Sequence, residues 1–319
     1  MGKKHLGGEK ILALNRTSSG ILASILALVK PDDDVVHYLP QFPSHPSIPR
    51  STELIGANYH EFDDLNNFKV RDETGLVVIT GSTMDHQVLK REDFLRIIEI
   101  SKAKNVPVLV DDASGARLRT IVYKQPRAMD MGADLVITST DKLMDGPRGG
   151  LMSGRRELVD LVKSKAHQFG LEAQPPLIAG MVRALENFNP ELILKAKEQK
   201  KEVYQALVAD LKEIKETPTG IMLLPDDIMK ILHYSGVKTS LTPMEVANVL
   251  AMIFLRDHNI ITIPAVGMPG ASPTIRLDMA SKDAQRLETD YIIQAFNNAF
   301  FKLQEVIGDE YECKKILFN

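Results

Sequence analysis

Two segments that read as strands are followed by side chains capable of acid–base or covalent chemistry. Asp111 directly follows the apolar run 108–110, and Lys142 comes shortly after the run 135–137. Nearer the start of the chain, a helical pattern over residues 21–30 is preceded by hydroxyl side chains: Thr17, Ser18 and Ser19. A helix start binds anions because its backbone N–H groups are unpaired and its dipole is positive there. The chain thus offers a carboxylate, an amine and an anion cradle.

These three features match what pyridoxal 5'-phosphate (PLP) needs from a protein. The helix start would hold the phosphate, the carboxylate would keep the pyridine nitrogen protonated, and the lysine would form the Schiff base. Each feature is common by itself, and it is their order and spacing that favour this cofactor. The eight histidines include no pair at metal-binding helical spacing, so we expect no metal site. No Walker phosphate loop or nucleophile elbow is found either.

The elements expected to position these residues alternate between β-branched runs and helical segments over residues 11–140. This alternation predicts an α/β fold with a mainly parallel sheet. The expected strands are Asp34 to Leu39, Leu54 to His60, Leu76 to Thr80, Val106 to Asp111 and Leu135 to Ser139. The clearest helix between them spans Arg91 to Lys104. Open parallel sheets bind ligands outside the carboxyl ends of their strands, which is where Asp111 and Lys142 fall.

The second half of the sequence predicts a smaller unit. A charged helical stretch covers residues 190–215, and Thr242 to Glu245 form a capping box that begins another helix. Two short strands are expected, at residues 260–264 and 274–279, separated by a Gly- and Pro-rich turn over 267–273. A final helix carries an apolar stripe that we interpret as core: Ile292, Phe296, Ala299, Phe300 and Leu303.

Length and composition limit the class of protein. At roughly 100 to 200 residues per domain, a chain of 319 residues suggests two domains. We expect a large α/β domain over 1–165, connecting helices over 166–189 and a small α+β domain over 190–319. The formal charge is −3, without the excess of Lys and Arg that nucleic-acid binders usually carry. The single cysteine excludes an intrachain disulfide, and no signal peptide or apolar span is found, so we expect a cytoplasmic enzyme and no membrane association.

The lysine region also resembles a known family. Residues 139–150 read STDKLMDGPRGG. They resemble the serine-X-aspartate-lysine-leucine block and following glycine-proline turn of bacterial selenocysteine synthase and its archaeal selenocysteine-synthase-like relatives. The resemblance covers about residues 14–156 and, more loosely, the small domain. It implies the fold of fold type I PLP-dependent enzymes: a large domain with a mainly parallel sheet and a small C-terminal α+β domain.

The resemblance implies roles for the residues that hold the cofactor. Lys142 would be the Schiff-base lysine, and Asp111 would bind the pyridine nitrogen, with Asp112 as the competing acid. Ala113 would pack on the ring face. Ser139 would contact the phosphate beside the three hydroxyl side chains of the helix start. We assign the stacking ring on the other face to His45 or Phe42, which follow the strand at residues 34–39.

Other site residues are expected from position alone. The segment after the strand at 76–80 usually touches the phenolic oxygen of the cofactor, and its polar residues are Ser82, Thr83, Asp85 and His86. In the small domain, Arg276 resembles the arginine that binds a substrate α-carboxylate, because a guanidinium matches a carboxylate bidentately. Arg16 and Arg148 are further anion-binding candidates. Arg148 is expected to reach a neighbouring subunit, since sites of this fold lie at dimer interfaces.

The resemblance leaves the reaction less defined than the cofactor. We expect β- or γ-elimination or replacement on an amino acid or a similar small-molecule amine, in a homodimer with shared active sites. Only fourteen residues precede Asn15, whereas bacterial selenocysteine synthase has a tRNA-binding region there, so no stable tRNA complex is expected. One alternative is an ammonia-lyase or aldolase acting on a phosphorylated amino sugar or sugar acid. Its extra cations would be Arg16, Arg117, Arg119 and Arg148. Another is a binding protein that keeps the fold without catalysis.

Overall fold

The computed structural model describes residues 1–266 and 273–318, so most of the expected turn at 267–273 lies outside the described residues. The chain divides into two compact units, Met1–Pro190 and Glu191–Asn319. Each unit has its own hydrophobic core. The two units are therefore described separately.

Unit 1 (Met1–Pro190) is built on a seven-stranded sheet in the order β1-β7-β6-β5-β4-β2-β3. The strands are β1 (Lys10–Leu14), β2 (Asp34–Tyr38), β3 (Asn58–Phe62), β4 (Thr74–Thr80), β5 (Val108–Asp111), β6 (Leu135–Ser139) and β7 (Gly150–Gly154). The neighbours from β3 to β6 pair in parallel, whereas β7 runs antiparallel to both β6 and β1. The expected mainly parallel α/β sheet is confirmed.

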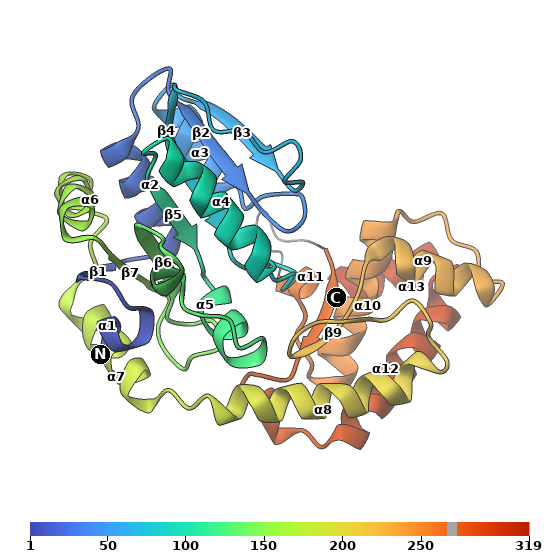
Figure 1. Ribbon diagram of the computed structural model, residues 1–319. Coiled ribbons are helices and arrows are strands. Elements are labelled where there is room, and N and C mark those ends of the chain that lie inside the picture. Colours follow the sequence, from blue (N-terminus) through green and yellow to red (C-terminus); the bar gives the residue numbers. More distant parts are fainter. Residues whose placement is uncertain (267–272, 319) are drawn as a thin grey trace. The chain divides into compact units, whose positions relative to one another are not determined.

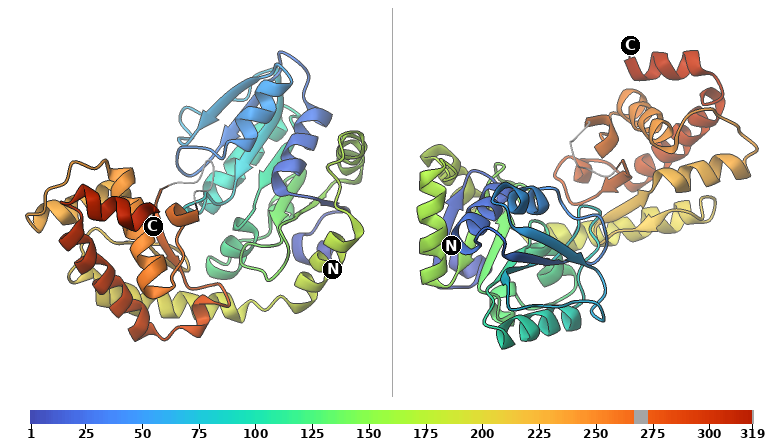
Figure 2. Two further views of the ribbon diagram at one scale, coloured as in Figure 1. Left: turned by 180° about the vertical axis from the view of Figure 1, so that it is seen from behind. Right: turned by 90° about the horizontal axis from the view of Figure 1, so that it is seen from above.

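Helices cover both faces of this sheet. In Figure 1, α4 (Arg91–Ala103) lies in front of the strands, on the face that also packs against α1 (Gly2–Leu6). Figure 2 shows the opposite face from behind, where α2 (Thr17–Leu28), α3 (Ser47–Leu54) and α6 (Arg156–Gln168) lie. Along β4, Val77 and Ile79 face one layer of helices while Leu76 and Val78 face the other. Because both faces are covered, the strands are apolar on both sides and read as continuous apolar runs.

The connections after β5 and β7 are mostly helical. After β5 come α5 (Gly115–Arg117), a π-helical turn at Leu118–Val122 and a 3-10 turn at Ala128–Met131. After β7, α6 is followed by α7 (Pro175–Asn187). Both α6 and α7 belong to unit 1.

Two segments of unit 1 differ from the sequence prediction. The expected strand from Leu54 begins only at Asn58, because Leu54 ends α3 and the chain turns at Gly56, whose φ of 71° favours glycine. The strands β1 and β7 were not predicted. β7 reads GLMSG, and glycine and serine are poor β-formers, so its sequence gives a weak strand signal. An added Cβ at Gly150 would overlap the backbone of Arg16, which explains why glycine stands there.

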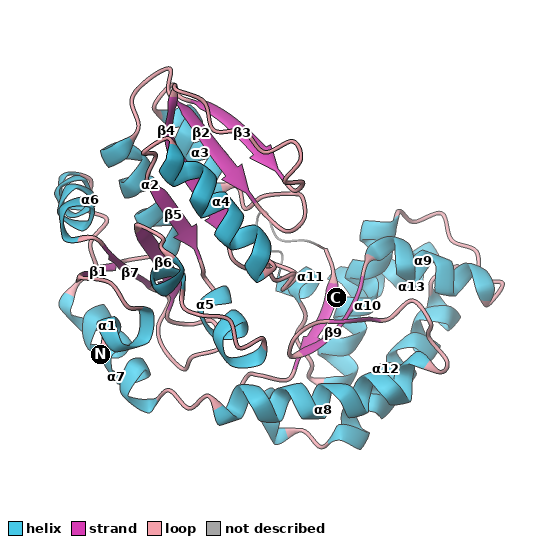
Figure 3. Ribbon diagram, in the orientation of Figure 1, coloured by secondary structure: helices cyan, strands magenta, loops and turns pink. Residues whose placement is uncertain are grey.

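Unit 2 (Glu191–Asn319) consists mainly of helices around a small sheet, as the colours of Figure 3 show. Its helices are α8 (Glu191–Val208), α9 (Pro225–Tyr234), α10 (Pro243–His258), α11 (Ile263–Val266), α12 (Thr289–Val306) and α13 (Glu310–Phe318), with a 3-10 turn at Ala284–Arg286. Three antiparallel strands follow the order β10 (Ile275–Asp278), β9 (Gly220–Leu223), β8 (Lys215–Glu216). Among the described helices of the chain, none is both long and apolar enough to cross a membrane.

Several predictions for unit 2 can be compared with the structure directly. The capping box at the start of α10 is confirmed: the Thr242 N–H donates to Glu245 Oε2 at 2.8 Å, and the Glu245 N–H donates to Thr242 Oγ1 at 3.4 Å. The apolar stripe of α12 is buried. The expected strand at 260–264 is wrong, because Asn259 ends α10 in a left-handed conformation and Pro264 lies in the first turn of α11. Proline suits a helix start, which explains the difference.

Candidate active site

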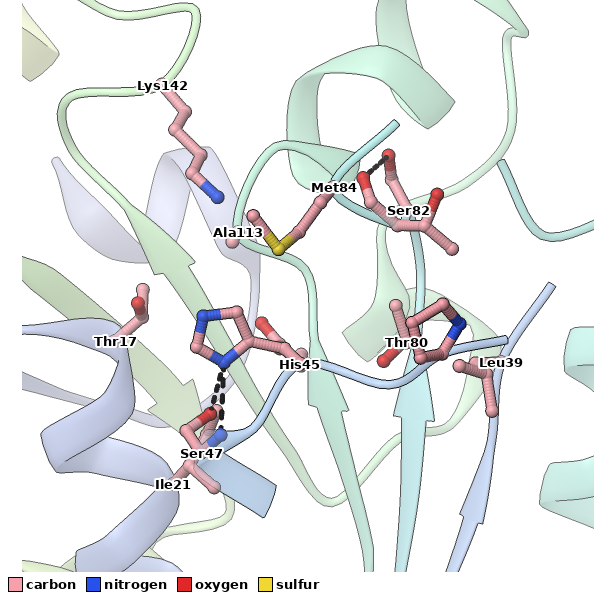
Figure 4. A pocket seen from close by; sticks show the side chains of 13 residues that line it. Thr17, Ile21, Leu39, His45, Ser47, Thr80, Ser82, Met84, Ala113 and Lys142 are labelled. Carbon is pink, nitrogen blue, oxygen red and sulfur yellow. Dashed lines mark hydrogen bonds between the residues drawn. The ribbon is translucent and has the colours of Figure 1, made fainter. Parts of the chain in front are cut away.

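A pocket lies in unit 1 at the carboxyl ends of the parallel strands (Figure 4). The chain runs from β2 to the edge strand β3 and then returns to β4 on the other side of β2. Such a reversal of strand order is where open α/β sheets bind ligands. The residues that line the pocket come from the start of α2 and from the segments that follow β2, β4, β5 and β6: Thr17, Ile21, Leu39, Pro43, His45, Ser47, Thr80, Ser82, Thr83, Met84, Asp111, Ala113 and Lys142.

Asp111 ends β5 and is buried in the wall of this pocket. Its Oδ1 atom has no hydrogen-bond partner among the described residues. Burial raises the pKa of the Asp111 carboxyl above its usual range, and His45 and Lys142 oppose that shift through their charge. A buried carboxylate oxygen without a partner is costly. The pocket therefore favours a ligand that brings a cationic or hydrogen-bond-donating group to Asp111.

The neighbouring acid, Asp112, is bound elsewhere. Arg119 donates to both of its carboxylate oxygens, with the Nε–Oδ1 distance at 3.1 Å, and both side chains are fully buried. The guanidinium of Arg119 also lies over the ring of Phe94, 4.9 Å from its centroid. Of the two acids that the sequence left open, Asp111 is the one that lines the pocket.

Lys142 follows β6 in a loop that returns to the sheet at β7. Thr140 closes this loop, since its N–H donates to the carbonyl of Gly149 at 3.0 Å and its hydroxyl donates to that of Pro147 at 2.6 Å. Gly146 packs so tightly that a Cβ there would lie 2.6 Å from the Ala184 side chain. Figure 4 shows the Lys142 side chain extending from this loop toward Ala113 and His45. The glycine-proline turn thus shapes the loop that presents the amine.

Arg117 connects the two strand ends that carry the acid and the amine. Its Nη2 donates to the carbonyl of Ala113 at 2.6 Å and to that of Ser139 at 2.7 Å. The side chain is fully buried, and burial lowers its pKa to about 10, which leaves it charged at neutral pH. Arg117 and Arg119 are therefore structural cations inside unit 1. The expectation that they bind a substrate phosphate is wrong, because both side chains are fully buried and neither is in the described lining of the pocket.

His45 lines the pocket, whereas Phe42 does not. The N–H of Ser47 donates to His45 Nδ1 at 3.2 Å, and the Ser47 hydroxyl lies 2.8 Å from the same atom. Nδ1 is therefore an acceptor, so a neutral His45 carries its proton on Nε2, which faces the pocket beside Lys142 and Thr17 in Figure 4. Burial lowers the pKa of His45; the charge of Asp111 opposes this shift, and the charges of Lys142 and Arg50 add to it. A neutral imidazole suits a stacking position.

The hydroxyl groups expected to bind phosphate divide into two sets. Thr17, the first residue of α2, lines the pocket together with Ile21 one turn later. Ser18 and Ser19 belong to the same turn but are absent from the lining. Ser139 is also absent, and its hydroxyl is bonded to the Asp141 carboxylate. The phosphate roles of Ser18, Ser19 and Ser139 stay predictions.

None of the three arginines expected to bind substrate is in the described lining of the pocket. Arg148 is exposed, and its Nε lies 3.7 Å from Asp141 Oδ2. Arg16 is exposed just before α2. Arg276 lies on β10 in unit 2, paired in register with Met222. Their contacts with a substrate stay predictions.

Some lining residues were not singled out from the sequence. The sequence predicted Thr80 only as the end of a strand and predicted no role for Ser47 or Met84, although all three line the pocket. Ser82 and Thr83 were expected from position and do line the pocket, whereas Asp85 and His86 do not. A usable signal existed for Thr80, because a hydroxyl that ends a buried apolar strand falls at the edge where such sheets bind ligands.

Comparison with solved structures defines the fold. A putative O-acetylhomoserine (thiol)-lyase from Campylobacter jejuni, described with an N'-pyridoxyl-lysine-5'-monophosphate, matches at a TM-score of 0.64 and 16% identity, over 94% of this chain and 84% of that one. N-Succinyldiaminopimelate aminotransferase from Mycobacterium tuberculosis matches at a TM-score of 0.62 and 17% identity, over 93% and 80%. At such identities the likeness establishes the fold alone, which is that of fold type I PLP-dependent enzymes.

Sequence comparison defines the family. A UPF0425 pyridoxal phosphate-dependent protein from Methanosphaera stadtmanae is 50% identical over 319 residues, which is all of this chain and 83% of that protein. The model of the UPF0425 C-terminal domain matches residues 210–288, and that of L-seryl-tRNA selenium transferase matches residues 73–221. The chain belongs to the UPF0425 family of pyridoxal phosphate-dependent proteins. The second match confirms the expected relation to the selenocysteine synthases.

Proposed function

We propose that this protein is a PLP-dependent enzyme that catalyses elimination or replacement on an amino acid or a similar small amine. The observation that carries the proposal is one pocket lined by both Lys142 and Asp111, whose buried Oδ1 has no partner in the part of the chain that the structure describes. PLP needs an amine to attach it and an acid at its ring nitrogen. The family to which the chain belongs supports the same cofactor.

Each group of PLP has a counterpart among the lining residues. Asp111 would hold the proton on the ring nitrogen, which removes the cost of its buried Oδ1. Ala113 and the neutral ring of His45 would cover the two ring faces. Thr17 and the unpaired N–H groups at the start of α2, a helix of twelve residues, would hold the phosphate. When bound, PLP withdraws electrons and so stabilises negative charge on the carbon next to the substrate amine.

The chain supplies the base for this chemistry. Once the substrate amine replaces it at the cofactor, the Lys142 amine would take the proton from the substrate α-carbon and later return it. Departure of a group from the β- or γ-carbon would give elimination, and addition of a nucleophile there would give replacement. The apolar side chains of Ile21, Leu39 and Met84 in the pocket wall would limit access of water.

The choice of elimination or replacement is supported by one comparison. The matched family model is that of a selenium transferase, which is named for transfer of a group. The alternative of a lyase or aldolase on a phosphorylated sugar needs cations beyond those for the cofactor. Of the four arginines expected for this role, Arg117 and Arg119 bind the Ala113 carbonyl and the Asp112 carboxylate. Arg16 and Arg148 are absent from the described lining of the pocket.

We propose further that the substrate is a free small molecule and that the enzyme is a homodimer with shared active sites. The formal charge of −3 gives little attraction for the phosphates of a tRNA. Closed two-fold symmetry is the commonest arrangement of oligomers. Unit 1 exposes the apolar side chains of Phe169, Ile178 and Val182, which a second copy could cover. Analytical ultracentrifugation that finds only monomer, or a tight, salt-sensitive gel shift with tRNA, would reject the corresponding part.

The reaction class can be tested in deuterium oxide. The purified protein with PLP is incubated with amino acids that carry a leaving group, such as O-acetylserine and O-acetylhomoserine. We expect exchange of the α-proton, followed by release of acetate with keto acid and ammonia, or with a thioether when a thiol is added. Lys142→Ala is the control and is expected to show neither. Exchange without loss of the leaving group would rule out elimination and replacement, and no exchange on any amino acid would favour a binding protein.

A further inference from the structure

The loop over residues 39–46, between β2 and α3, carries His45 into the pocket and is held on both sides of that residue. On one side, the Ser44 hydroxyl lies 2.9 Å from the hydroxyl of Tyr59, on the edge strand β3. On the other side, the Ser47 N–H donates to His45 Nδ1 at 3.2 Å, and the Ser47 hydroxyl lies 2.8 Å from the same atom. Ser47 is the first residue of α3. The loop is thus anchored to a strand and to a helix.

The Tyr59 hydroxyl has a partner for its proton and for each of its two lone pairs. Its oxygen lies 2.9 Å from Oε2 of Glu61 and 2.7 Å from Nδ1 of His37. Because an ionised carboxylate can only accept, the phenolic proton points to Glu61, and the Ser44 hydroxyl and His37 Nδ1–H donate to the oxygen. His37 is fully buried on β2, and its Nε2 lies 2.8 Å from the Thr80 hydroxyl at the end of β4. Ser44 is therefore bonded to an oxygen that the sheet holds in place.

The bonds from Ser47 determine which side of the His45 ring carries a proton. A backbone N–H can only donate, so Nδ1 presents its lone pair to Ser47. A proton on Nδ1 would point at that N–H, which opposes formation of the imidazolium. The charged groups that act on the ring are Asp111, whose charge favours the imidazolium, and Lys142 and Arg50, whose charges oppose it. The balance leaves a neutral ring with its proton on Nε2, the nitrogen that faces the pocket in Figure 4.

We propose that Tyr59 and Ser47 are positioning residues that fix His45 as a hydrogen-bond donor toward the pocket and so exclude it from proton transfer. A ring whose Nε2 bears the proton has no free lone pair on the pocket side and cannot take a proton there. Loss of that proton would leave an imidazolate, which is far too basic to form near neutral pH. Proton transfer in the pocket therefore falls to the Lys142 amine.

This inference rests on the proposed function for the reaction that it constrains. In that reaction the α-proton leaves the substrate and is later returned. A loose His45 could turn and present a lone pair, and it would then be a second base in the pocket. With both anchors in place, His45 would cover one face of the cofactor ring without competing with Lys142 for the proton.

The protonation of His45 can be tested without any cofactor. Nitrogen-15 NMR of the full chain with labelled histidine reports which ring nitrogens carry protons, and His45→Gln identifies the signals of this residue. An ordinary histidine changes its charge between about pH 5 and pH 8. We expect His45 to stay neutral and protonated on Nε2 from about pH 6 to pH 8. A proton on Nδ1, or an imidazolium that forms within this range, would overturn the proposal.

The role of the two anchors is tested with the same signals. Ser47→Ala loses the hydroxyl beside Nδ1, and Tyr59→Phe loses the bond to Ser44. Each is expected to release the ring, so that a mixture of the two neutral tautomers, or a titration within the same pH range, develops. Tyr38→Phe is the matched control, because Tyr38 is also buried but donates to the Asp63 carbonyl instead. Wild-type signals in Tyr59→Phe or in Ser47→Ala would show that the substituted residue does not position the ring.

The consequence for the ligand is tested by the affinity for PLP. Ser44→Ala breaks only the bond from the loop to Tyr59 and is expected to weaken PLP binding about threefold to tenfold. In the His45→Ala background the same substitution should have no further effect, because it acts through His45. Equal losses in the two backgrounds would contradict the proposal, since the anchor would then act on the pocket by another route. Failure of wild type to bind PLP would instead reject the proposed function and leave the NMR result standing.

Discussion

Two adjacent buried acids, Asp111 at the pocket edge and Asp112 in the layer directly behind it, have opposite surroundings. At the edge, Asp111 has a buried oxygen without a partner among the described residues. Behind it, Asp112 receives bonds to both of its carboxylate oxygens from Arg119. The layer behind is satisfied by the protein itself, and the edge is satisfied only by a ligand. A carboxylate that its own protein leaves unsatisfied is thus placed where a ligand can reach it, and the acid next to it serves the structure.

Arg117 shows how the supporting layer controls the edge. Its guanidinium bonds to the carbonyls of Ala113 and Ser139, which flank the strand ends that carry Asp111 and lead to Lys142. A buried side chain therefore holds together the two strand ends that carry the acid and lead to the amine. Residues of this kind act through backbone geometry, and substitution there is expected to reduce both folding and function.

The largest expected effect is on the rate of α-proton exchange and comes from a substitution at the pocket edge. Lys142→Ala should lower the rate of substrate α-proton exchange by about 10² to 10⁴-fold, because general base catalysis is lost. The melting temperature should change little, since Lys142 is exposed. Exchange measured by NMR and thermal unfolding monitored by circular dichroism check the two parts. Exchange at the wild-type rate would exclude Lys142 as the base.

A substitution in the supporting layer should instead lower the folding stability. Arg119→Met leaves the Asp112 carboxylate buried and unpaired, and breaking such a pair costs about 3 to 5 kcal/mol of folding free energy. The double variant Arg119→Met with Asp112→Leu should recover much of this loss, because no isolated charge remains. Urea unfolding of the three proteins measures it. A stable single variant would show that Asp112 is not held as described.

Asp111→Asn is expected to make the protein without PLP more stable and to weaken PLP binding. Its raised pKa means that the folded state binds the proton more tightly than the unfolded state. The destabilising contribution of Asp111 therefore develops as pH rises above the ordinary carboxyl range and through the folded pKa. The variant should gain about 1 to 3 kcal/mol at neutral pH and lose this advantage in acid.

Unfolding of Asp111→Asn and wild type across pH, with and without PLP, measures both effects. The matched control is Asp112→Asn, which should lose stability at neutral pH because it weakens the bonds to Arg119. If both variants respond alike, the contrast between the two acids is wrong.

The smallest expected effect lies in unit 2. Thr242→Ala removes the side-chain half of the capping box of α10 and should cost about 1 kcal/mol. PLP affinity should stay unchanged, because Thr242 is far along the chain from every residue that lines the pocket. Fluorescence titration with PLP checks this, and weaker binding would mean that the helix contributes to the site.

The sequence predicted those parts of the fold that depend on local pattern. β4 and β6 were found because their apolar runs are covered on both faces, and α10 because Thr242 and Glu245 form a local cap. β7 was missed because its residues are poor β-formers that are held between two neighbouring strands. Pairing of this kind depends on residues distant in the sequence, which a local pattern cannot show.

For the pocket, the sequence indicated an acid, an amine and a histidine that line it, because strand ends and the lysine block are local features. It could not distinguish Asp111 from Asp112 by pattern, since that choice depends on where Arg119 lies. It also gave Arg117 and Arg119 an exposed role, because a sequence shows charge but not burial. The hydrogen bonds that connect Glu61 through Tyr59 and His37 to Thr80 join residues of three strands, and no local pattern in the sequence could reveal them.

The central claim, that Lys142 and Asp111 form a PLP site in this pocket, is tested most directly by trapping the cofactor. The purified protein is incubated with PLP, reduced with borohydride and digested, and the modified peptide is identified by mass spectrometry. We predict a stoichiometric phosphopyridoxyl group on Lys142 in wild type and much less in Asp111→Asn at the same PLP concentration. A group spread over surface lysines, or none at Lys142, would contradict the account.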